Sequence, residues 1–259
     1  MYQATDNQEN DVRIHALKQQ IQALRQKLPY YQLEREARQS APAHFFERHH
    51  QQSLQQVVPQ ICLQQVQDKA QLEAILKRCL DFPTLIIQLG AASSHSDFNR
   101  IYEDLKTIRK ALPQHFLMVS DRIVDEYQIL TARHAGADGI ILNLSELGKN
   151  RSKTYCNKVH LWGMEPIMRV KNLSGLEALA SLPTRCVWLD AISERESFAL
   201  KQSRLLKSFF WSGLSISEPL PDSVPEKLQT QQVIVDCSLW QKPDPGIELE
   251  HLQRLYPGG

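Results

Sequence analysis

The chain has 259 residues, 42% of them hydrophobic, a size that suits one large α/β domain with a substantial core. Its 30 Lys and Arg residues are balanced by 29 Asp and Glu residues, so the formal net charge is only +1. A nearly neutral chain lacks the global field that would recruit nucleic acid or an anionic membrane, and any anion site must be local.

The cysteines indicate the redox environment. There are five, an odd number, and they form no Cys-x-x-Cys pair, which predicts reduced, buried thiols rather than disulfides or a metal site. No apolar run approaches the ~18 residues needed to span a bilayer, and residues 1–10 are too polar for a signal peptide. We therefore expect a cytoplasmic protein that binds no metal, nucleic acid or membrane.

The N-terminal region is predicted to be helical. Ile14, Leu17, Ile21, Leu24 and Leu28 recur every three or four residues and form one apolar stripe, so we expect a helix over residues 13–27. The polar stretch 34–50 predicts a second short helix and a connector. A coiled coil is the alternative for the first helix, although its stripe lasts barely two heptads.

From Val57 onward, short apolar runs alternate with amphipathic stretches, which is typical of strand–helix units and a parallel sheet. Eight units predict a closed barrel. We expect the strands at residues 61–63, 84–89, 115–119, 138–143, 166–170, 185–189, 208–211 and 232–236.

The fourth helix is hard to find, because residues 148–160 hold several basic and few apolar side chains. This composition predicts a mobile loop with a frayed helix. Its Lys149, Arg151, Lys153 and Lys158 form either a solvated basic surface or an anion-binding patch.

Three segments resemble a known enzyme family. Residues 116–142 contain Ser120-Asp121, then an Ile-x-Asp-x-Tyr-Gln-Ile run, then an Ala-Arg-x-x-Gly-Ala-Asp junction. Residues 238–246 read Ser-Leu-Trp-Gln-Lys-Pro-Asp-Pro-Gly, and residues 162–165 are a weaker match. Through these segments the chain resembles the indole-3-glycerol phosphate synthases from about Arg13 to Leu255.

The resemblance implies one TIM (β/α)8 barrel domain over residues 1–259. Residues 1–56 would be an N-terminal helical extension that caps the bottom and side, and residues 57–259 the barrel. Enzymes of this family close an indole ring with loss of carbon dioxide and water, without a cofactor. Such chemistry needs a general acid, a base and a phosphate site at the carboxyl ends of the strands.

The family's charged residues are replaced on several strands. Its Ala-Glu-x-Lys run on the first strand corresponds to the neutral stretch 61–65, and its acid lysine on the third strand corresponds to Ser120. The glutamate positions on the fifth and seventh strands correspond to Arg169 and Trp211. A serine hydroxyl is too weak an acid to replace an ammonium group, and a guanidinium is essentially never deprotonated.

Other charged residues near the expected mouth remain candidates. Asp121, Arg122, Arg169 and Asp190, together with Lys171, would form a new charged set. For a phosphate, the resemblance implies Ser212, Gly213 and Ser238 as ligands. Asp236 would oppose them, because a carboxylate repels a phosphate dianion.

Three functions follow from these replacements. The favoured hypothesis is a degenerate paralogue that keeps the barrel, lacks the ring-closing activity and acts as a binding or scaffolding protein. The alternatives are an enzyme with altered chemistry built on the new charged set, and an indole-3-glycerol phosphate synthase with displaced catalytic groups. The expected partners are a small phosphorylated ligand and a protein of tryptophan metabolism.

Overall fold

The computed structural model describes residues 2–41, 43–44, 56–90, 98–171, 175, 178–189, 211–216, 232–235 and 237. For residues 2–10, 56, 98–99, 211–216 and 232–233, only the backbone is described.

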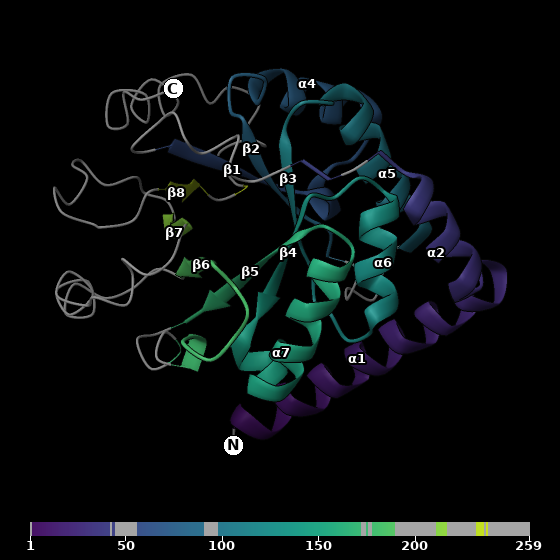
Figure 1. Cartoon of the computed structure of the whole chain (residues 1–259), viewed down its shortest axis with the longest axis vertical. Helices are drawn as coiled ribbons and strands as arrows, with labels where there is room; N and C mark the ends of the chain where they lie inside the picture. The colour runs from purple at the N-terminus through teal and green to yellow at the C-terminus, as the bar shows by residue number, and fades with distance from the viewer. Residues whose placement is uncertain are drawn as a thin grey trace, which may run out of the picture.

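Parallel strands form a closed barrel in chain order, in which each strand pairs with its sequence neighbours and β8 pairs with β1 (Figure 1). This confirms the predicted (β/α)8 fold. The strands are β1 (Gln56–Cys62), β2 (Thr84–Gln88), β3 (Phe116–Ser120), β4 (Gly139–Asn143), β5 (Glu165–Val170), β6 (Cys186–Leu189), β7 (Trp211–Ile216) and β8 (Gln232–Val235).

Side chains alternate between the two faces of each strand, so every strand has inward and outward positions. Inward residues such as Val58, Met118 and Trp188 pack on one another inside the barrel. Outward residues such as Ile87 and Leu117 belong to the larger apolar cluster between the barrel and its helices. This alternation decides which residue of each strand end faces the mouth, the opening at the carboxyl ends of the strands.

Helices cover the outside of the first half of the barrel (Figure 1). A short 3₁₀ turn, η1 (Leu63–Gln65), precedes the first of them. Helix α6 begins with a capping box, in which Asp125 accepts from the backbone N–H of Tyr127 and the Gln128 side chain accepts from that of Asp125. The helices are α4 (Lys69–Arg78), α5 (Phe98–Ala111), α6 (Glu126–His134) and α7 (Leu144–Leu161).

The prediction of a loop over residues 148–160 is wrong, because these residues belong to α7. The helix has one break, at Gly148, whose backbone has φ 68° and ψ 168°. Beyond it, Ser152, Tyr155, Cys156 and Val159 are buried at spacings of three and four residues. Lys149, Arg151 and Lys153 are exposed, and Lys158 forms an ion pair with Glu126 at 2.9 Å. The polar Ser152 obscures the buried stripe in the sequence.

Two strands differ from their expected bounds by more than one residue. Strand β1 begins five residues earlier than predicted, at Gln56. Strand β7 runs from Trp211 to Ile216, so the prediction of residues 208–211 is wrong and Trp211 starts the strand instead of ending it. The pairing of β7 with β6 shows the same start, because Trp211 lies beside Cys186, the first residue of β6.

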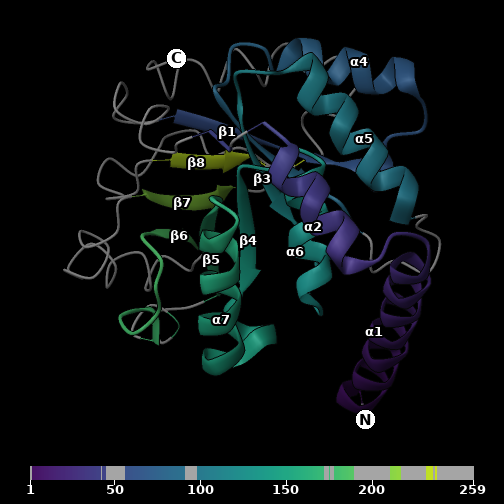
Figure 2. The same cartoon turned by 45° about the vertical axis from the view of Figure 1, so that its right-hand side comes forward.

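The N-terminal extension runs from the mouth of the barrel to its bottom. Helix α1 (Tyr2–Lys27) packs through Leu17 and Ile21, which are almost fully buried, while its N-terminal end projects from the barrel (Figure 2). Helix α2 (Tyr30–Gln39) then packs against α6. The resemblance implies an extension that caps the bottom and side of the barrel, and in the structure α1 also reaches the mouth through Arg13.

A buried ion-pair network closes the bottom of the barrel. Asp138, directly before β4, pairs with Arg109 and accepts from the backbone N–H groups of Leu117 at 2.9 Å and His44 at 2.8 Å. Arg109 also donates to the carbonyl of Gly136 at 2.9 Å. Because His44 belongs to the extension, this network holds the extension to the barrel.

All five cysteines are buried free thiols, as predicted. Burial raises the pKa of Cys79 and that of Cys156 to about 12 each. In the part of the chain that the structure describes, no helix is long and apolar enough to cross a membrane.

Candidate functional site at the barrel mouth

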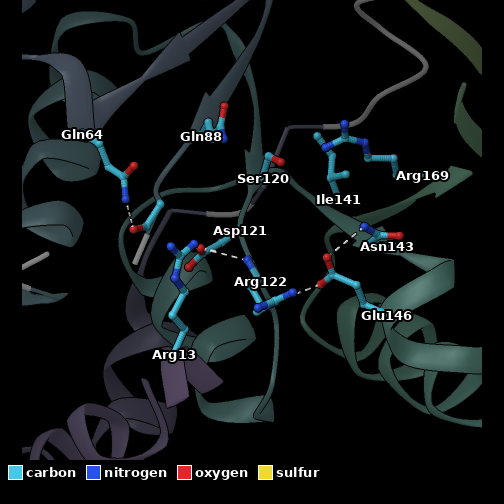
Figure 3. A pocket seen from close by; sticks show the side chains of 11 residues that line it. Arg13, Gln64, Gln88, Ser120, Asp121, Arg122, Ile141, Asn143, Glu146 and Arg169 are labelled. Carbon is cyan, nitrogen blue, oxygen red and sulfur yellow. Dashed lines mark hydrogen bonds and ion pairs between the residues drawn. The ribbon is translucent and has the colours of Figure 1, made fainter. Parts of the chain in front are cut away.

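A pocket of about 350 Å³ opens at the carboxyl ends of β2, β3, β4 and β5 (Figure 3). Its floor consists of neutral polar side chains, Gln88, Ser120 and Asn143, together with Ile141. This is the end of the barrel where enzymes of this fold place their active sites, so it is the candidate functional site. Its rim carries the charged residues Arg13, Asp121, Arg122, Glu146 and Arg169.

In a (β/α)8 barrel, alternate strands contribute side chains to the same interior layer. The last inward positions of β3 and β5 are Ser120 and Arg169, two residues beyond the interior residues Met118 and Ile167. On β1, Gln60 follows the interior Val58 by the same spacing. We call Gln60, Ser120 and Arg169 the mouth layer.

Strand β7 contributes the fourth position of this layer. Its Ser215 pairs with Ile234, a residue of the interior cluster, so Ser215 is the last inward backbone position of the strand. The expectation that Trp211 stands at the mouth end of this strand is therefore wrong, because Trp211 is its first residue.

On β1 the inward positions favour a placement of the expected family run that is two residues earlier than residues 61–65. In the family's Glu-x-Lys run, the glutamate and the lysine are two residues apart, so both side chains point into the barrel. Gln60 and Cys62 are the two inward residues with this spacing at the end of β1. The amide of Gln60 donates a hydrogen bond of 2.6 Å to the Gln88 side chain. A neutral amide pair thus lies at the mouth ends of β1 and β2.

Ser120 lies at the end of β3, is 8% exposed and faces the pocket. The next residue, Asp121, accepts from the backbone N–H of Arg122 at 2.8 Å. Burial, and to a lesser extent the charge of Asp121, raises the pKa of the nearby Tyr102 well above its usual value. The Tyr102 phenol therefore stays neutral and offers no base to the site.

The two carboxylates of the rim, Asp121 and Glu146, each lie near an arginine. Arg122 forms an ion pair with Glu146 at 3.3 Å, and Glu146 also accepts from Asn143 at 3.2 Å. Figure 3 shows Arg13, from α1, pointing toward Asp121. These contacts place two arginines and two carboxylates along one side of the pocket.

Arg169 reaches the pocket from β5, the opposite side in Figure 3. Its guanidinium lies 4.5 Å from the ring centroid of Trp188 on β6, an arrangement typical of a cation–π contact. The family resemblance implies a glutamate at this position. Lys171, two residues further, is exposed and is not among the residues that line the pocket.

Not all predicted site residues join this pocket. Ser212 and Gly213 are the second and third residues of β7 and pair with Val187 and Trp188, so the expectation that they begin a loop after the strand is wrong. Asp190, Asp236 and Ser238 lie outside the described residues. Among the described residues, no group of His, Cys, Asp or Glu could hold a metal ion.

Sequence reasoning missed four polar or charged side chains of the pocket, Arg13, Gln88, Asn143 and Glu146, as well as Gly90 and Ile141. Gln88 and Asn143 each end an apolar strand, and a polar residue two positions after a buried one is the signal that could have identified them. Nothing in the sequence connects Arg13 with residues more than fifty positions away.

Comparison with known proteins supports the resemblance over the middle of the chain. The sequence model of the indole-3-glycerol phosphate synthase family matches residues 92–190. These residues include everything from α5 to β6, and therefore Ser120, Asp121, Arg122 and Arg169. The strands β1, β7 and β8 lie outside the match.

Proposed function

Since this chain is an indole-3-glycerol phosphate synthase-like barrel, we propose that it binds a small polar anion at its mouth and lacks the family's ring-closing activity. In this role it is a binding or scaffolding protein. A protein of tryptophan metabolism is the partner class that the family relationship favours.

The observation that carries the proposal is the chemistry of the mouth layer. Gln60 and Ser120 are neutral, and Arg169 is a permanent cation, so none of the three exchanges a proton near neutral pH. Gln88 and Asn143, which line the same pocket, are neutral amides. The described interior of the mouth can therefore donate hydrogen bonds to a ligand but offers no general acid or base.

The kinetic consequence is large. General acid and general base groups each contribute ~10²–10⁴ in rate, so the loss of an acid at Ser120 and a base at Arg169 removes most of the acceleration. A serine hydroxyl cannot protonate a carbonyl as an ammonium does. Arginine at the fifth-strand position also reverses the sign of the charge there.

One observation favours an enzymatic alternative. In the sequence, β7 is followed directly by Ser217 and Glu218, the first two residue types of the family's Ser-Glu-Ser-Gly run. Glu218 lies outside the described residues. Under this alternative, Glu218 would act with the rim acids Asp121 and Glu146 on a phosphorylated or anthranilate-derived substrate.

Complementation tests the catalytic half of the proposal. A tryptophan auxotroph that lacks indole-3-glycerol phosphate synthase should not grow without tryptophan when it expresses this chain from a plasmid. Growth would contradict the proposal. If growth occurs and Glu218→Gln abolishes it while Asp121→Asn does not, the seventh-strand carboxylate is the catalytic group.

The binding half is tested by the ligand-induced shift in melting temperature. Small organic anions should stabilise the protein, since they bind the folded state only. Arg169→Gln should remove this stabilisation, because it removes the cation of the mouth layer. Lys171→Gln is the matched control, since Lys171 is exposed on the same chain segment, and it should retain the full shift.

A further inference from the structure

Arg13 lines the pocket although it belongs to α1, outside the barrel. It lies four and eight residues before Leu17 and Ile21, so the three share one face of the helix. Leu17 and Ile21 are 1% and 2% exposed. The face of α1 that packs on the protein through Leu17 and Ile21 therefore also places the Arg13 guanidinium at the mouth.

The other end of α1 holds the helix in this position. Arg25 forms an ion pair of 2.5 Å with Asp125, the N-cap of α6, and lies over the Tyr127 ring at 5.4 Å. The Tyr127 hydroxyl donates to the carbonyl of Leu28 at 2.9 Å. The connection between β3 and α6 thus begins with the pocket residues Asp121 and Arg122 and ends with Asp125, which contacts α1.

The charges along the pocket favour a ligand with one negative charge. Three arginines and two carboxylates line it, which leaves a formal charge of +1 among the described residues. A dianion would meet both carboxylates at short range, whereas a monoanion matches the excess cation. An arginine has five N–H donors, so it can contact a carboxylate of the protein and one of the ligand together.

The remaining lining groups favour a hydroxylated ligand. Gln64, Gln88, Ser120 and Asn143 provide neutral donors and acceptors, and Ile141 is the one apolar side chain among the described lining residues. The Gln60–Gln88 hydrogen bond orients one of these amides. Hydroxyl groups match such a surface better than a hydrocarbon or an aromatic ring does.

We propose that Arg13 is a ligand-binding residue supplied by α1, and that the ligand is a hydroxylated organic acid with a single carboxylate, of the sugar-acid class. This inference rests on the proposed binding function and deepens it. A bound acid that contacts both Arg13 and the barrel also connects α1 to the mouth.

Isothermal titration with three compounds of one carbon skeleton tests the ligand class: gluconate, neutral glucose and dianionic glucose 6-phosphate. Gluconate should bind most tightly. Arg13→Gln should weaken gluconate binding by roughly tenfold or more, as expected for loss of a charge-assisted hydrogen bond. Lys18→Gln is the matched control, because Lys18 is an exposed cation on the same helix and does not line the pocket.

Arg13→Lys separates charge from geometry, and it should retain part of the affinity because it keeps the charge and loses the planar fork. Tighter binding of glucose 6-phosphate or glucose, or no gluconate binding, would overturn the ligand class. If Arg169→Gln abolishes gluconate binding while Arg13→Gln does not, the role of Arg13 is wrong and the proposed function stands. If neither variant alters binding, the ligand is not at the mouth and both proposals fail.

Discussion

Arg169 and Trp188 form a cation–π pair across β5 and β6, with the guanidinium 4.5 Å from the ring centroid. Trp188 is 1% exposed and belongs to the barrel interior. The indole therefore supports the arginine from below and orients it at the mouth. The resemblance implies that a carboxylate that moves protons stands at this position in the family, whereas this chain has an arginine packed on an aromatic ring.

Trp188→Phe should lower the free energy of unfolding by about 1–3 kcal/mol, because it leaves a cavity in the packed interior. It should also weaken anion binding, because phenylalanine is a poorer platform for Arg169. Urea denaturation and anion titration measure the two effects. Trp162→Phe is the matched control, since Trp162 lies under Arg38 at 5.1 Å outside the mouth. Equal loss of binding in both variants would contradict the role of Trp188.

Asp138→Asn should lower the free energy of unfolding by about 3 kcal/mol, because it leaves the Arg109 guanidinium without its buried carboxylate. Burial already lowers the pKa of Arg109, and the Asp138 charge opposes this shift. Chemical denaturation gives the value. Glu103→Gln removes an exposed ion pair with Lys106 and should change stability by less than about 1 kcal/mol. A similar loss of unfolding free energy in both variants would show that the buried Asp138–Arg109 pair stabilises the protein no more than an exposed ion pair does.

Glu165, at the start of β5, predicts a pH dependence of stability. Burial raises its pKa above the usual value near 4.5, although Arg185 and His160 oppose the shift. A raised carboxyl pKa means that the folded state holds the proton more tightly, so stability is lost as pH rises through that pKa. Glu165→Gln should therefore be more stable than the native protein at pH 7, and this advantage should disappear below about pH 4.5. A constant difference between the two proteins from pH 4 to pH 7 would contradict the prediction.

Much of the barrel follows from local sequence patterns. Apolar runs such as 84–88 and 139–143 predict buried parallel strands, and the stripe around Leu17 predicts a packed N-terminal helix. The sequence also predicts that Ser120 and Arg169 lie at the mouth of the barrel. Ser120 is the last residue of β3, and Arg169 is the last but one residue of β5.

The remaining features depend on tertiary pairing. The residues before Trp211 are strongly apolar, so they were mistaken for β7, and only the ladder with β6 and β8 fixes the true register. Helix α7 was missed because its buried stripe includes Ser152. Arg13 joins the site through the docking of α1, which no local pattern encodes.

The central claim is that the mouth binds a ligand but does not close an indole ring. The most direct test is to incubate purified protein with 1-(2-carboxyphenylamino)-1-deoxyribulose 5-phosphate and follow the formation of indole-3-glycerol phosphate. We predict a rate no higher than that of the buffer control, because the mouth layer of Gln60, Ser120 and Arg169 provides no general acid or base. Saturable formation of indole-3-glycerol phosphate above that control would contradict the account.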